Sequence, residues 1–158
     1  MSEPSAEIDL VRAFFKALQA MDLDEALSYM ADNVEYQNMP LPPVKGHQGV
    51  LKILGPMKKR CSGFEVSIRQ IASNGRAVLT ERTDAVFLGP VRIPFQVCGT
   101  FEIKDGKITV WRDTFDWASG LVNTVIAGPL YAFRRVSIPL GMKIAMKKAE
   151  RAAAKAAA

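Results

Sequence analysis

The stretch Ala77-Val-Leu-Thr-Glu-Arg-Thr-Asp-Ala-Val-Phe-Leu88 decides how the rest of the sequence is interpreted. Its alternating pattern and the Gly89-Pro90 pair that follows it predict a β-strand that ends in a turn. Because strand side chains point alternately to two faces, Arg82 and Asp84 share one face with Val78, Thr80, Val86 and Leu88. An arginine and an aspartate among apolar neighbours indicate either an ion pair on the solvent side of a sheet or a buried functional site.

Three more strands are predicted around this one. Phe64, Val66 and Ile68 alternate ahead of the turn signal Ser73-Asn74-Gly75. Residues 91–103 form the next strand and residues 108–116 the last, with the hairpin turn Lys104-Asp105-Gly106-Lys107 between them. Strands joined in succession by short turns predict an antiparallel meander.

The residues before these strands favour helices. One apolar series at three- and four-residue spacing predicts a helix that begins near Ser5 or Ala6: Leu10, Val11, Phe14, Phe15 and Leu18. A short helix opens at Asp22, a strand covers residues 33–39, and a third helix follows Gly46. Helices followed by a run of strands predict an α+β domain over residues 1–120, with a curved sheet wrapped around the N-terminal helices.

Composition excludes several classes of protein. The chain has 158 residues, of which 49% are apolar, as expected for one globular domain. No uninterrupted apolar run reaches the roughly 18 residues that a membrane-spanning helix needs. Two cysteines, Cys61 and Cys98, and the single histidine, His47, give no zinc-ligand spacing, so we predict no metal site. The acidic N-terminus lacks the pattern of a secretory signal and favours a cytoplasmic protein.

The positive charge of the chain is confined to its C-terminal end. The formal net charge is +5, but residues 134–158 hold seven bases and one acid, so the rest is nearly neutral and no nucleic-acid partner is predicted. Residues 121–146 are apolar and predict a helical segment packed on the domain or on a partner. Residues 147–158 form a basic, alanine-rich tail, either a solubilising extension or a weak contact with anionic membrane surfaces.

The turns predict where two charged residues meet across the sheet. A hairpin at Gly89-Pro90 sets Arg82 opposite Val97 or a neighbour, and a hairpin at Asp105-Gly106 sets Asp113 opposite Cys98. Arg82 and Asp113 then lie at the same level two strands apart, roughly 10 Å between backbones, which a guanidinium can bridge. With these registers the side chains of Arg82 and Asp113 would point to opposite faces of the sheet, because Val97 and Cys98 are adjacent. A β-bulge is therefore required for both side chains to point inward.

Three separated motifs together resemble one family. They are Tyr36-Gln37-Asn38-Met39, Thr80-Glu81-Arg82-Thr83-Asp84 and Trp111-Arg112-Asp113-Thr114-Phe115-Asp116. In this order they resemble the limonene-1,2-epoxide hydrolase family, including its mycobacterial branch, and the resemblance covers residues 8–117. It implies the cone-shaped, cystatin-like α+β fold shared with nuclear transport factor 2 and ketosteroid isomerase, and a homodimer. The chain departs from the family in its tail, in Thr114 and in the loop 40–49, which bear on substrate choice.

The resemblance also implies a catalytic set. In that family a tyrosine, an asparagine and an aspartate hold the attacking water, while an arginine and a second aspartate serve the epoxide. By motif these residues are Tyr36, Asn38, Asp113, Arg82 and Asp84. Opening an epoxide needs a nucleophile on carbon and a proton on the leaving oxygen, so we expect Asp113 as base and Asp84 as acid, with no cofactor.

The expected function is therefore the addition of water, in one step, to a lipophilic epoxide to give a vicinal diol. Apolar residues expected to line the substrate site are Met39, Leu41, Phe87, Phe95, Val97, Phe101, Trp111 and Phe115. Two other functions stay open at this point. One is an isomerase or cyclase acting on a steroid or polyketide, and the other is a non-catalytic carrier of a lipophilic ligand.

Overall fold

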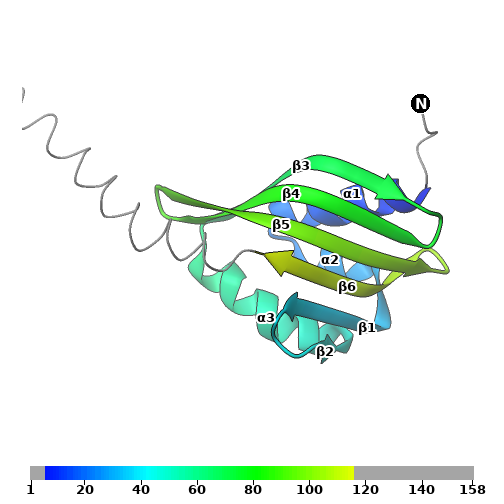
Figure 1. Cartoon of the computed structure of the whole chain (residues 1–158). Coiled ribbons are helices and arrows are strands. Elements are labelled where there is room, and N and C mark those ends of the chain that lie inside the picture. Colours follow the sequence, from blue (N-terminus) through cyan, green and yellow to red (C-terminus); the bar gives the residue numbers. More distant parts are fainter. Residues whose placement is uncertain (1–5, 116–158) are drawn as a thin grey trace, which may run out of the picture. The chain divides into compact units, whose positions relative to one another are not determined.

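The computed structural model describes residues 6–115, in which two helices come first and a third helix separates two strands from the four that follow (Figure 1). The elements are α1 (Ala6–Gln19), α2 (Leu23–Ser28), β1 (Met30–Met39), β2 (Val44–Lys45), α3 (Gly46–Arg60), β3 (Gly63–Ser73), β4 (Ala77–Leu88), β5 (Val91–Lys104) and β6 (Lys107–Phe115). The predicted segments 121–146 and 147–158, and the end of the predicted domain 1–120, lie outside the described residues. No helix within residues 6–115 is long and apolar enough to cross a membrane.

The strands form one mixed sheet. Its order is β2-β1-β6-β5-β4-β3. The predicted meander is confirmed, because β3, β4, β5 and β6 pair with their neighbours in antiparallel fashion. β1 lies beside β6 and runs parallel to it, and β2 completes the edge. The two residues of β2 follow Pro42-Pro43 and are too few to show a periodic pattern, so the sequence did not predict this strand.

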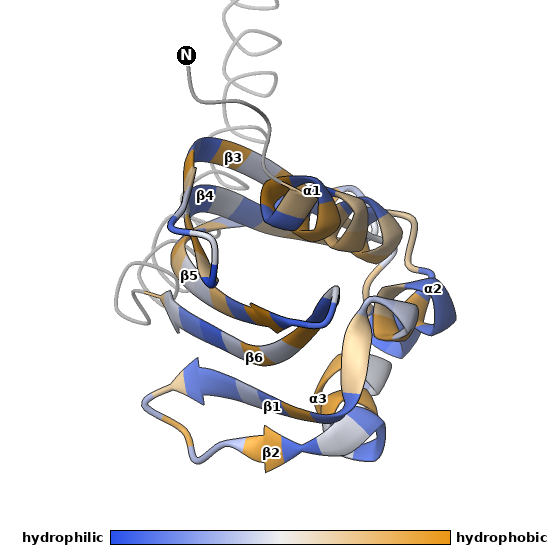
Figure 2. Ribbon diagram, turned by 90° about the vertical axis from the view of Figure 1, so that its right-hand side faces the viewer, coloured by the Kyte–Doolittle hydropathy of each residue, from blue (hydrophilic) through white to orange (hydrophobic). Residues whose placement is uncertain are grey.

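The helices cover one face of the sheet. Figure 2 shows the strands following an arc that opens toward the helices. The predicted apolar side of α1 is buried there, and Phe14 and Phe15 contact aromatic rings of the sheet, Trp111 and Phe101. At the start of α2, Asp22 Oδ1 accepts a hydrogen bond from the backbone N–H of Glu25 at 3.0 Å, as an N-cap does. The α+β class with a sheet curved around N-terminal helices is confirmed.

The register of β5 and β6 differs from the prediction by one residue. Arg82 pairs with Val97 as predicted, but Asp113 pairs with Gly99 and not with Cys98. The cause is a bulge in β6: Ile103 pairs with Ile108 and Glu102 with Val110, which leaves Thr109 as the extra residue. The hydroxyl of Thr109 donates to the Glu102 carbonyl at 3.1 Å. The bulge that the sequence required is therefore present, and it turns Asp113 to the face that carries Arg82.

Candidate active site

The guanidinium of Arg82 organises a polar cluster on the inner face of the sheet, the face that the helices cover. Its Nε donates to both carboxylate oxygens of Asp84 at 3.0 Å, and its Nη2 donates to Asp113 Oδ2 at 2.6 Å. Its Nη1 donates to the hydroxyl of Thr80 at 3.0 Å. The centre of the guanidinium lies 4.8 Å from the ring centroid of Phe15, which closes the cluster on the side of α1.

Burial makes this cluster different from an ordinary surface ion pair. The side chain of Arg82 is 1% exposed, and those of Asp84 and Asp113 are 5% and 7% exposed. Burial raises the pKa of Asp84 to about 6, although the Arg82 charge opposes the rise. Burial also raises the pKa of Asp113, again against Arg82. Both carboxyl groups therefore hold protons more readily than free aspartate, and the alternative of a solvent-side ion pair is excluded.

The parallel neighbour β1 brings two more polar side chains to the cluster. Asn38 pairs with Asp113, and Tyr36 pairs with Trp111. The Tyr36 hydroxyl donates to Asn38 Oδ1 at 3.0 Å, and its ring stacks on Trp111 with centroids 4.0 Å apart. Burial raises the pKa of Tyr36, so its hydroxyl keeps its proton and acts as a hydrogen-bond group. All five residues predicted for catalysis thus face the same region of the sheet.

The two carboxylate oxygens of Asp113 differ in their contacts. Asp113 Oδ1 is buried and has no hydrogen-bond partner among the described residues, whereas Oδ2 is held by Arg82. A buried carboxylate oxygen without a donor is costly, and a catalytic role is one reason for which proteins keep such atoms. Oδ1 is therefore the atom of the cluster best suited to accept a proton from a reactant.

Two residues of the cluster were not singled out from the sequence. Thr80 was placed on the face of Arg82 without a role, and it is buried. Gly99 pairs with Thr80 and Asp113 from either side, and a Cβ added to it would lie 2.8 Å from Asp113 Oδ1 and would collide with Arg82 Nη1. The absence of a side chain at position 99 is what leaves room for the guanidinium. Once the bulge is known, the pairing across the strands is the signal that identifies Gly99.

Most of the predicted apolar lining lies near the cluster. Phe95 pairs with Asp84, Val97 with Arg82 and with Phe115, and Phe101 with Trp111, so these five share the inner face. Met39 pairs with Thr114, one residue out of phase with Asn38, and Leu41 lies beyond the end of β1; they are 36% and 49% exposed. Phe87 is likewise out of phase with Asp84 and lies on the opposite face of β4, against Gly63. These placements correct the assignment of Met39 and Phe87 to the substrate wall.

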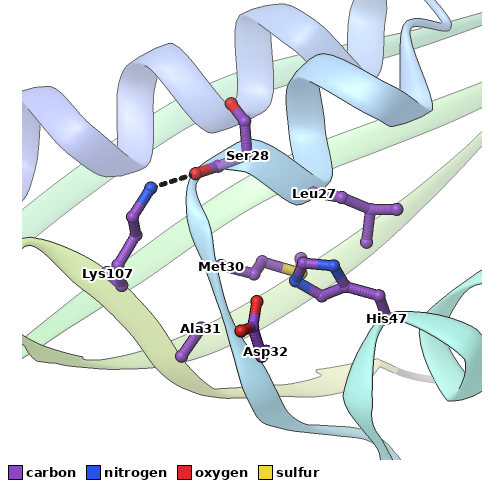
Figure 3. Close-up of a pocket in the computed structure, with 7 residues that line it drawn as sticks. All are labelled: Leu27, Ser28, Met30, Ala31, Asp32, His47 and Lys107. Carbon is purple, nitrogen blue, oxygen red and sulfur yellow. Dashed lines mark hydrogen bonds between the residues drawn. The ribbon is translucent and has the colours of Figure 1, made fainter.

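A separate hollow of about 410 Å³ lies at the other end of β1 (Figure 3). It is lined by Leu27, Ser28, Met30, Ala31, Asp32, His47 and Lys107. None of the predicted catalytic residues is among them. The ammonium of Lys107 donates to the Ser28 carbonyl, and His47 Nε2 is buried without a hydrogen-bond partner among the described residues. No group of three or more potential metal-ligating side chains gathers within residues 6–115.

Comparisons with known proteins agree with this geometry. The limonene-1,2-epoxide hydrolase catalytic domain, as a family, matches residues 5–125. Epoxide hydrolase EphG of Mycobacterium tuberculosis is 46% identical over 106 residues, which are 67% of this chain and 70% of that protein. The solved structure of an M. tuberculosis LEH-like epoxide hydrolase is 41% identical, with a TM-score of 0.66, and the match covers 80% of this chain and 99% of that one.

More distant structures share the fold alone. An NTF2-like protein of unknown function from Burkholderia pseudomallei is 16% identical, with a TM-score of 0.67, over 75% of this chain and 96% of its own. The nuclear transport factor 2-like fold predicted from the motifs is confirmed. The family match spans well over half of the chain and includes all three motifs. The chain belongs to the limonene-1,2-epoxide hydrolase family.

Proposed function

We propose that this chain adds water to a lipophilic epoxide in one step and releases a vicinal diol. The observation that supports this most directly is one buried guanidinium that holds two carboxyl groups, one of which keeps an oxygen without a hydrogen-bond partner within residues 6–115. Such an arrangement can supply a base and an acid at the same time. Opening an epoxide without a carbocation requires both at once.

In the proposed step, Asp113 Oδ1 takes a proton from a water molecule while the water oxygen attacks one epoxide carbon. The bond from that carbon to the epoxide oxygen breaks, and the leaving oxygen takes the proton of a neutral Asp84. The site then holds a protonated Asp113 and an ionised Asp84, so one proton must return to Asp84 before the next turnover. Each proton transfer of this kind contributes about 10²–10⁴ to the rate.

Charge in the cluster supports one shared proton. With both aspartates ionised, Arg82 leaves one surplus negative charge inside a buried site, and one bound proton removes it. Burial raises the pKa of both carboxyl groups, to about 6 for Asp84, in agreement with this state. The two groups interact through one arginine, so they titrate as a pair.

The remaining predicted residues fit supporting roles. Tyr36 and Asn38 are bonded to each other and lie beside Asp113 along the parallel pair of strands, where they can hold the attacking water. The inner-face side chains Phe95, Val97 and Phe115 offer an apolar surface next to Asp84 and Arg82. A terpene, fatty-acid or sterol epoxide would match such a surface.

Three further proposals concern the setting of the enzyme. The family resemblance supports a homodimer formed through the outer face of the sheet. A cytoplasmic location and a weak contact between the basic tail and anionic membranes stay predictions from the sequence. Gel filtration and light scattering of the full chain test the first, and co-sedimentation of full-length and truncated chains with anionic vesicles at low salt tests the last.

The reaction is tested by a single turnover in water labelled with heavy oxygen, using a panel of epoxides of graded size. We expect the label in the diol and none in the protein. Label found in a carboxylate of the enzyme would show an alkyl-enzyme ester and overturn the one-step scheme. Turnover of a steroid by double-bond migration, with no diol from any epoxide, would favour the isomerase alternative.

A further inference from the structure

The contacts of Arg82 with its two aspartates are unequal. Nε reaches both oxygens of Asp84, but Arg82 gives Asp113 a hydrogen bond at one oxygen, from Nη2 to Oδ2. Arginine commonly binds a carboxylate through two parallel hydrogen bonds, because the fork of its N–H groups matches the two oxygens. Some other contact must therefore keep the second terminal nitrogen, Nη1, away from Asp113 Oδ1.

That contact is with Thr80. Its hydroxyl accepts a hydrogen bond from Nη1 at 3.0 Å. The three atoms in question converge on the space above Gly99: a Cβ there would be 2.8 Å from Thr80 Oγ1, 2.8 Å from Asp113 Oδ1 and in collision with Arg82 Nη1. Nη1 and the two acceptors thus lie close to one point, and among the described residues the hydroxyl is the acceptor that Nη1 binds.

We propose that Thr80 is a positioning residue, whose hydroxyl binds Arg82 Nη1 and holds the guanidinium in an orientation that disfavours a two-point pair between Arg82 and Asp113. The consequence is that Asp113 Oδ1 stays free to take the proton of the attacking water. This inference rests on the proposed function for its catalytic meaning, but the arrangement of hydrogen bonds on which it depends can be measured without turnover. Thr80 touches no reactant and acts through Arg82.

Removal of the hydroxyl should redirect the guanidinium. In Thr80→Val the shape of the side chain is kept, but Nη1 has no acceptor and a buried N–H group without a partner is costly. Asp113 Oδ1 lies at the same space above Gly99 and has no partner among the described residues, so we expect a second charge-assisted hydrogen bond to form there. That bond lowers the pKa of Asp113 and occupies the oxygen that acts as base.

The experiment compares the wild-type chain with Thr80→Val, Thr80→Ser and Thr83→Val. Thr83 lies on the opposite face of the same strand, where its hydroxyl donates to Gln96 at 3.2 Å, so it is a matched control for losing a strand hydroxyl. We expect kcat of Thr80→Val to fall by about 10- to 100-fold, with KM little changed. The low-pH limb of its pH–rate profile should move to lower pH. Thr80→Ser should restore both, and Thr83→Val should match the wild type.

A second readout separates this inference from the proposed function. Carbon-13 NMR titration of the aspartate carboxyl groups reports the pKa of Asp113 directly, and we expect a lower value in Thr80→Val than in the wild type. If that shift is seen in a chain that hydrolyses no epoxide, the positioning role stands and the proposed function fails. An unchanged Asp113 titration in a folded Thr80→Val chain, or an equal loss of kcat at all pH values, would overturn the inference.

Discussion

The two faces of the sheet at β4 carry the same kind of contact, an arginine with a carboxylate, in opposite environments. On the inner face Arg82 binds Asp84 and Asp113, and its side chain is 1% exposed. On the outer face Arg69 Nη1 lies 3.2 Å from Glu81 Oε1, and those two side chains are 64% and 47% exposed. Exposed pairs of this kind contribute little to stability or chemistry, because water and salt screen them.

The two environments shift carboxyl pKa values in opposite directions. On the outer face the hydrogen bond from Arg92 lowers the pKa of Glu65. On the inner face burial raises the pKa of Asp84 to about 6, although Arg82 acts to lower it. The contact with arginine acts in the same direction in both places, and burial decides the outcome. The comparison teaches that the surroundings of the pair, rather than the pair itself, fit the inner cluster for proton transfer.

The strongest test of this difference removes one carboxylate from each face. Asp113→Asn and Asp84→Asn should each lower kcat/KM on an epoxide by about 10²–10⁴-fold, because an amide can serve neither as base nor as acid. Glu81→Gln, on the outer face, should leave kcat/KM unchanged. Circular dichroism and urea unfolding check that all three variants are folded. Substantial turnover by Asp113→Asn would refute the role assigned to that residue.

Replacing the arginines by lysine tests how much the fork geometry matters. Arg82→Lys should lower kcat/KM by about 10²-fold, since an ammonium cannot hold two carboxyl groups in one plane and misplaced groups react slowly. Arg92→Lys, in the outer pair with Glu65, is the matched control and should keep wild-type activity. Equal activities for the two lysine variants would mean that charge alone suffices in the inner cluster.

Adding one methyl group to a strand glycine compares the packing of the two faces. Gly99→Ala should lower the free energy of unfolding by about 1–3 kcal/mol, because the new Cβ meets Arg82, Asp113 and Thr80. In Gly63→Ala the new Cβ meets only the Phe87 ring, at 3.4 Å, an ordinary contact. That variant should unfold at the wild-type urea concentration or above it. A stability loss shared by both variants would show that the space above Gly99 is not special.

The smallest expected effect concerns the pH at which kcat/KM begins to fall. Activity needs Asp84 protonated and Asp113 ionised, so kcat/KM should fall about tenfold per pH unit above the apparent pKa of the acid and also fall at low pH. With the pKa of Asp84 raised to about 6, the falling limb should begin near that pH. Glu65→Gln should move neither limb. A rate that rises steadily from pH 6 to pH 9 would contradict the assignment of the acid.

Local pattern was enough to predict the strands that carry the charges. The bounds of β4 and the pairing of Arg82 with Val97 follow from alternation and from one tight turn. The pairing of Asp113 with Gly99 could not be derived in the same way, because Thr109 adds a residue after the turn and no local signal marks it. Phe87 was misplaced for a related reason: an aromatic residue in a strand is apolar on either face.

The contribution of β1 lay beyond any local argument. β1 and β6 pair in parallel although about seventy residues separate them, and no hairpin fixes their register. Only the family resemblance linked Tyr36 and Asn38 to Asp113 before the structure was known. Thr80 and Gly99 were missed because their importance depends on the orientation of one side chain, Arg82.

The bulge at Thr109 means that β6 is one residue longer than its partner β5 requires. A deletion of one residue between the Lys104–Lys107 turn and Trp111 would therefore be absorbed by a regular ladder, with Asp113 still opposite Gly99. A deletion of one residue between Trp111 and Asp113 lies beyond the bulge and is not compensated in this way. It would turn the aspartate to the outer face. In this strand, tolerance to changes in length is expected to end abruptly at Trp111, a boundary that substitutions alone would not reveal.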